Sequence, residues 1–197
     1  FIMKRLLLIL ILTFSFQTLT KADDISDFQI EGMSIGDSLL DFFTKQEIVN
    51  SPKAKQYKDK EYVTATFYKL KTENYNAINV SFKKKDTKYI IEGMSGSKDF
   101  NNKIKKCYDK QNEVFSELKK LFPNYEKKDE NNLRNIKWSK TGTTNQSYIK
   151  LKEKSFVGVQ CFKYGKDDKK KYNLRDIMRV SLFTKKYNYW LVNIAFK

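Results

Sequence analysis

Alternating apolar and polar positions predict strands in the first half of the chain. Residues 62–70, 77–83 and 88–92 each show a period of two, with valine, isoleucine and phenylalanine between polar neighbours. The links between these segments are short. Short links favour antiparallel hairpins, because a parallel crossover needs about a dozen residues or more. We therefore expect an antiparallel meander of three strands here.

Helical spacing marks two other stretches. Ser34 and Asp37 can cap a helix over residues 34–45, in which apolar side chains recur every three or four positions. A longer helix is expected over residues 97–121, and Pro123 ends it. Lysines and carboxylates share its other face, which is typical of a solvent-exposed helix surface.

The second half of the chain again predicts strands. They are expected over residues 133–139, 147–152, 156–164, 177–184 and 189–196. The last two predict a hairpin joined by residues 185–188. Consecutive strands with few helices are typical of α+β proteins. We therefore predict an α+β fold, with an antiparallel sheet or sheets and two helices packed on one face.

The pentapeptide Ile-Glu-Gly-Met-Ser occurs twice, at residues 30–34 and 91–95. In each copy the glycine can adopt a positive φ and the serine can cap a helix after it, so both copies predict a turn before a helix. The repeat indicates two related halves, residues 23–93 and 94–197, each a helix with a β-meander. Similarity beyond the pentapeptide is poor, so a shared local turn is the alternative.

The N-terminal residues have the layout of a secretory signal peptide. A Lys-Arg pair precedes an apolar-rich run over residues 6–16, which is shorter than the about 20 residues of a membrane span. Ala22 is a small residue at the expected cleavage site. We predict a cleaved signal peptide, residues 1–22, and a mature single α+β domain, residues 23–197, in the periplasm or secreted. An uncleaved N-terminal anchor is the alternative.

The chain is strongly basic, with a formal net charge of +16. Lysine far outnumbers arginine, which pairs best with phosphate and guanine, so nucleic acid is disfavoured as a partner. Most lysines are expected to form a solvated coat. Two clusters at expected hairpin tips are candidates for contact with an acidic protein or an anionic envelope surface. They are Lys83, Lys84 and Lys85, and Lys169, Lys170 and Lys171.

Cys107 and Cys161 are the two cysteines, and the chain has no histidine. In an exported protein an even number of cysteines predicts a disulfide, which here would join a helix to a strand. Zinc sites draw mainly on Cys and His. We therefore predict a disulfide, no metal site and no bound cofactor.

Residues 36–39, Gly-Asp-Ser-Leu, resemble the signature of GDSL esterases and lipases, in which the serine is the nucleophile. That chemistry needs a general base, which in those enzymes is a histidine. Because this chain has none, we expect Asp37 and Ser38 to cap a helix instead.

Carboxylates could still catalyse hydrolysis without histidine, as in glycosidases. The candidates are Glu31, Asp41, Glu47 and Glu92, and nothing in their spacing selects a pair. We therefore predict no catalytic residues.

Most of the chain is similar to an uncharacterised family of exported proteins from AT-rich marine alphaproteobacteria. The likeness begins with DDISDFQIEGMSIGDSLLDFFTKQEI at residues 23–48 and continues at 57–60, 88–91, 106–108, 160–162 and 174–176. It implies export and paired cysteines and brings no known activity. A helix opening with Gly-x-Ser before a β-meander is more loosely similar to small envelope modules of the BamE or β-lactamase-inhibitor kind, which implies fold alone.

These observations favour an exported, periplasmic, non-enzymatic binding or envelope-associated protein. One alternative is a periplasmic hydrolase that uses carboxylates in place of histidine. Another, which requires that the chain is not exported, is a basic nucleic-acid-binding protein. The sequence does not identify a ligand.

Overall fold

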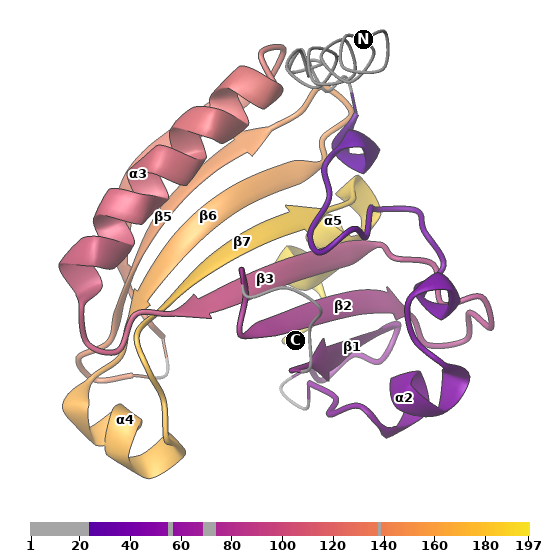
Figure 1. The fold of residues 1–197 in the computed structure, drawn as a ribbon, viewed down its shortest axis with the longest axis horizontal. Helices are drawn as coiled ribbons and strands as arrows, with labels where there is room; N and C mark the ends of the chain where they lie inside the picture. Colours follow the sequence, from indigo (N-terminus) through magenta and orange to yellow (C-terminus); the bar gives the residue numbers. More distant parts are fainter. Residues whose placement is uncertain (1–23, 55–56, 69–73, 138) are drawn as a thin grey trace, which may run out of the picture.

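A seven-stranded, fully antiparallel sheet organises the chain (Figure 1). The computed structural model describes residues 24–54, 57–68, 74–137 and 139–197. The strand order across the sheet is β1-β2-β3-β7-β6-β5-β4, so β3 and β7 join two meanders at its centre. The strands are β1 Tyr62–Phe67, β2 Ala77–Lys83, β3 Gly93–Asp99, β4 Lys127–Asn135, β5 Thr143–Lys150, β6 Phe156–Lys163 and β7 Ile177–Phe183.

Helices cover both faces of this sheet. The longest, α3 (Ile104–Leu121), lies across β5, β6 and β7 (Figure 1). The N-terminal segment packs on the same face, with two 3-10 turns, η1 (Ile25–Asp27) and η2 (Leu39–Asp41), and the short helix α2 (Lys45–Asn50). Helix α5 (Lys185–Asn193) packs on the opposite face, and α4 (Lys166–Tyr172) lies in the connection between β6 and β7. No helix in the described part of the chain is long and apolar enough to span a membrane.

The alternation of side chains along each strand explains why one face of the sheet is apolar and the other is polar. In β2, Ile78, Val80 and Phe82 are buried in the main core beneath α3 and the N-terminal segment. Asn79 and Ser81 point to the other face, because successive strand residues point to opposite sides. The predicted α+β class and antiparallel sheet are therefore confirmed.

The helix predicted over residues 34–45 is wrong. Gly36 has a φ of +95°, and its N–H donates to Ile91 O at 2.9 Å instead of continuing a helix. Leu39 N–H likewise donates to Tyr89 O at 3.1 Å. The apolar residues of this stretch still reach the core, but backbone bonds to a distant segment hold them there. The helix of this region begins after Thr44, which caps α2.

The two pentapeptide copies adopt different conformations, so the prediction of the same turn in both is wrong. In the first copy Glu31 and Gly32 have positive φ values of 55° and 81° and form a tight turn. The second copy runs into β3, where we expected a turn and the start of a helix. The strand predicted over residues 88–92 is therefore wrong, and the helix predicted from residue 97 begins at Ile104.

The predicted C-terminal hairpin is also wrong. Its first strand exists as β7, but residues 189–196 lie largely in α5. Thr184 caps this helix by accepting a hydrogen bond from Tyr187 N–H, and Tyr187 and Trp190 bury their rings beside Tyr62. The three-residue spacing of these two rings puts them on one face of a helix, and that packing outweighs the strand preference of aromatic residues.

Candidate functional site

A polar cavity of about 210 Å³ lies on the sheet face opposite α3, between the strands and α5, which contributes Tyr187 and Leu191 to its lining. Hydroxyl and amide side chains dominate its lining. We call this feature the polar cavity; its side-chain walls include Tyr57, Thr64, Asn79, Ser81, Ser95, Gln160, Arg179, Ser181, Phe183, Tyr187 and Leu191.

Strand register places these polar side chains next to one another. Asn79 pairs with Ser95, and Ser95 pairs with Ser181 across the central strands. Arg179 is flanked in the same way by Ser97 and Gln160. Asn79, Gln160, Arg179 and Ser181 each stand between two core positions of their strands, so the alternation that builds the core also builds a polar surface behind it.

Arg179 carries the only charge among the described residues that line the polar cavity. Its Nε donates to Ser97 Oγ at 3.4 Å, and its guanidinium carbon lies 4.9 Å from the ring centre of Phe162. Within the described ranges no carboxylate forms an ion pair with it. A half-buried guanidinium held against a ring, with donors left for bidentate pairing, is suited to an oxyanion.

A cluster of three hydroxyl groups closes the end of the polar cavity under α5. Ser81 Oγ donates to Tyr187 Oη at 2.9 Å, and Thr64 Oγ1 lies 2.8 Å from Ser81 Oγ. Tyr187 is only 2% exposed, and its burial raises the pKa of its phenol. The cluster is therefore a neutral set of hydrogen-bonding groups at ordinary pH.

The position of α5 depends on contacts with the loop that precedes β1. Trp190 Nε1 donates to Asp59 Oδ1 at 2.5 Å, and the ring of Tyr57 packs edge-on against Trp190. The N–H of Glu61 and then that of Trp190 hold the pKa of Asp59 below its ordinary value. The wall of the polar cavity formed by α5 is thus anchored at both its capped start and its middle.

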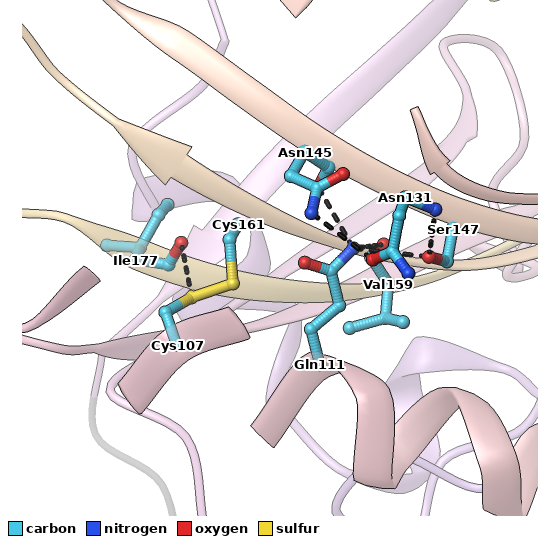
Figure 2. Close-up of a disulfide and its surroundings, with 8 residues drawn as sticks. All are labelled: Cys107, Gln111, Asn131, Asn145, Ser147, Val159, Cys161 and Ile177. Carbon is cyan, nitrogen blue, oxygen red and sulfur yellow. Dashed lines mark hydrogen bonds between the residues drawn. A yellow bond between two sulfur atoms is a disulfide. The ribbon is translucent and has the colours of Figure 1, made fainter. Parts of the chain in front are cut away.

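The disulfide and its neighbours hold α3 on the other face of the sheet (Figure 2). Cys107 on α3 is bonded to Cys161 on β6, as the cysteine count predicted, and both are fully buried. One turn further along α3, Gln111 Nε2 donates to the carbonyl oxygens of Asn145 and Val159 at 3.1 and 3.3 Å. Helix α3 is therefore fixed to β5 and β6 by a covalent bond and by polar contacts.

The two predicted lysine clusters lie at opposite ends of the sheet (Figure 1). Lys83 is the last residue of β2, and Lys84 and Lys85 follow it, whereas residues 169–171 belong to α4, at the end where β7 begins. The second cluster is helical and not the predicted hairpin tip. Lys169 Nζ also lies 2.8 Å from the buried carboxylate of Asp176, so its charge is neutralised. The two clusters do not form one surface.

The GDSL tetrapeptide has a structural role. Ser38 Oγ donates to Lys88 O at 2.8 Å and accepts from Leu40 N–H, capping η2. Asp37 accepts from Ser34 N–H at 2.8 Å. Ser38 thus has the expected capping role, although the element that it caps is a 3-10 turn, whereas Asp37 bonds to the preceding turn and caps no helix.

Two of the four carboxylates considered for hydrolysis bond to residues that cap helices. Glu47 completes the capping box of α2 with Thr44, and Glu92 accepts a hydrogen bond from Thr184 at the start of α5. Neither these nor Glu31 and Asp41 line the polar cavity. No group of histidine, cysteine and carboxylate side chains suited to a metal ion occurs in the part of the chain that the structure describes.

Comparisons with protein-family models, curated proteins and solved structures found no match. The function is therefore inferred from the polar cavity itself.

Sequence reasoning missed the residues of the polar cavity. The signal was present in the alternation, because Arg179 and Ser181 stand between Met178, Val180 and Leu182 in one strand. Arginine inside an otherwise half-buried strand is uncommon enough to mark a candidate site. The sequence alone could not show that serines from two other strands lie beside it.

Alkaline pH is expected to destabilise the fold through the buried phenols. Burial raises the pKa of Tyr62 to about 12 and also raises the pKa of Tyr187. Their stabilising contribution is complete below the unfolded value of about 10 and is lost as the pH rises through the folded pKa. Urea denaturation at about pH 9, 10 and 11 should show a falling midpoint, with a smaller fall in Tyr187→Phe. Equal losses in the two proteins would contradict this role for Tyr187.

Proposed function

We propose that this protein is an exported, non-enzymatic binding protein whose polar cavity takes a small organic anion. Arg179 carries this proposal, because it presents a guanidinium without an ion-pair partner among the described residues, beside serine and amide groups. A carboxylate or phosphate group of the ligand would pair with Arg179. The ligand's hydroxyl groups would bond to the side chains of Asn79, Ser95 and Ser181.

The size of the polar cavity limits the ligand. Sites for drug-sized molecules are about 300–1,000 Å³, and this cavity is smaller, at about 210 Å³. A ligand of the size of a single sugar acid or sugar phosphate would fit this volume. The flat ring of Tyr57 and the ring of Phe183 offer apolar faces on which such a molecule can rest.

The lining of the polar cavity supports binding and not catalysis. It holds serine and threonine hydroxyls, but its described residues include no carboxylate, cysteine or histidine to act as a general base. Export is supported by the predicted signal peptide, which lies outside the described residues, and by the buried disulfide, since such bonds persist in oxidising compartments.

Arg179→Gln is expected to weaken anion binding by about 10- to 100-fold, since a hydrogen bond to a charged group contributes roughly 1.5–3 kcal/mol. The measurement is isothermal titration with glucuronate, glucose 1-phosphate, inorganic phosphate and neutral glucose. At least one of the anions should bind, and glucose should bind more weakly. Rising ionic strength should reduce the anion affinity.

Arg175→Gln is the matched control, because Arg175 is exposed and already pairs with Asp99 at 3.3 Å. It should bind the anion like the unmodified protein. Anion binding that survives Arg179→Gln, or glucose binding as tight as that of glucuronate, would contradict the proposal.

A further inference from the structure

Helix α5 is apolar on two opposite sides. Its inner side buries Tyr187 and Trp190, which are 2% and 1% exposed. Its outer side presents Tyr189 and Val192, which are 63% and 72% exposed. A surface helix normally has one apolar stripe and an opposite polar face, and a helix that is apolar all round is normally covered. The outer side of α5 therefore has the composition of a contact surface.

Lysines surround these outer apolar side chains. A groove of about 510 Å³ runs between Tyr189 and Val192 and the side chains of Lys150, Lys154, Lys185 and Lys186. Lys150 lies 3.9 Å from Glu126, and the other three form no ion pair with any residue in the described ranges. The groove therefore combines exposed apolar groups with positive charge, and its described lining residues include no acidic one.

Two of these lysines occupy positions that are unfavourable for the helix. Lys185 and Lys186 are the first two residues of α5, where the helix dipole already places partial positive charge. Acidic residues are preferred there, and α5 has none in its first turn. Local stability thus argues against lysine at both positions, whereas an anionic partner would favour it.

We propose that the outer side of α5 is a membrane-docking surface that binds anionic phospholipid headgroups. Tyr189 and Val192 would enter the boundary between headgroups and acyl chains, and the surrounding lysines would contact phosphates, as in interfacial amphipathic helices. A second copy of this chain fits poorly, because a symmetric contact would bring these lysines against one another. An acidic protein would satisfy the lysines but gives less reason for exposed apolar side chains at the centre.

The test uses a fluorescent side chain placed on the proposed docking surface. Tyr189→Trp places a fluorophore on it, and Leu133→Trp places one at a similarly exposed apolar position on β4. Vesicles of equal parts phosphatidylglycerol and brominated phosphatidylcholine should shift the emission of the tryptophan at position 189 to shorter wavelength and quench it. The emission of the tryptophan at position 133 should stay unchanged. Each signal is the difference between the spectrum of the variant and that of the unmodified chain. Because the reporter is local, membrane binding by the N-terminal apolar run does not by itself produce the signal. Brominated phosphatidylcholine alone should give at least tenfold weaker quenching.

The role of the lysines is tested with the double change Lys185→Glu and Lys186→Glu in the Tyr189→Trp variant. This double change should lower the lipid affinity at least about tenfold. Glutamate is favoured at a helix start, so the loss cannot be attributed to unfolding of α5. The matched control is Lys105→Glu with Lys106→Glu, two exposed residues in the first turn of α3, which should retain most of the affinity.

Three results would overturn the proposal. They are an unchanged fluorescence spectrum of the Tyr189→Trp variant with anionic vesicles, equal quenching in neutral vesicles, and equal losses in the two double charge variants. A dimer in sedimentation velocity that dissociates on Val192→Ser would assign the surface to a second copy instead. None of these outcomes depends on the polar cavity, so the docking surface and the proposed anion binding are tested separately.

Discussion

Replacing both cysteines, Cys107→Ala with Cys161→Ala, is expected to lower the free energy of unfolding by about 4 kcal/mol. The disulfide joins residues 54 positions apart, so its loss frees a long loop in the unfolded chain. Both side chains are fully buried, and the small space left by the sulfur atoms adds to the loss. Guanidinium denaturation followed by circular dichroism measures the change.

A single change, Cys107→Ala, breaks the same bond and should have nearly the same effect, which separates the cross-link from side-chain packing. The far-ultraviolet spectrum should stay that of the intact protein, because Gln111 still ties α3 to β5 and β6. A loss below about 1 kcal/mol would mean that the bond contributes little. An intact mass beginning at Asp23 with both thiols blocked until reduction would support export of the same molecule.

Gly93→Val is expected to destabilise the protein by about 3 kcal/mol, at the upper end for overpacking. A Cβ at this position would lie 2.5 Å from the ring of Tyr187 and 3.1 Å from the ring of Phe183. Tyr187 cannot move aside freely, because it is buried and its oxygen accepts a hydrogen bond from Ser81. The substitution should therefore displace α5 and open the polar cavity. Denaturation and anion titration should both report it.

A double-mutant cycle with Tyr187→Ala tests the cause. If the ring is the obstacle, Gly93→Val should cost at least about 1 kcal/mol less in the Tyr187→Ala background, a coupling of the size expected for residues in contact. Additive effects would show that the cost arises elsewhere, for example in the backbone of β3.

Much of the sheet could be predicted because alternation is a local property. Strand β2 lies over the predicted residues 77–83, and β6 and β7 lie within a residue of their predicted bounds. The polar members of these strands were visible too, and the apolar neighbours of Arg179 mark it as a candidate, but the sequence does not show which side chains surround it. Its significance comes from Ser97, Gln160 and Phe162, which reach it from two neighbouring strands.

The wrong predictions share a cause. The second pentapeptide copy and the stretch before Thr44 have short-range signals for turn and helix, and longer-range contacts override both. In β3, Gly93 and Gly96 do not form a turn. Their lack of a side chain lets the rings of Tyr187 and Tyr75 pack close to the strand. In residues 34–45 backbone bonds to residues 89 and 91 replace those of a helix. Local propensity amounts to less than about 1 kcal/mol per residue, so a few tertiary contacts outweigh it.

The sequence by itself determined the α+β class, the antiparallel pairing and the bond between Cys107 and Cys161. Periodicity and link length are local properties of the chain, and two cysteines allow only one disulfide pairing. Only the tertiary structure decided the strand order, the helical state of residues 185–193 and the meeting of Arg179 with the serines of β3 and β7. Those features depend on which side chains face one another across the sheet. That pairing is fixed by the packing of the whole core and is not encoded in any one segment.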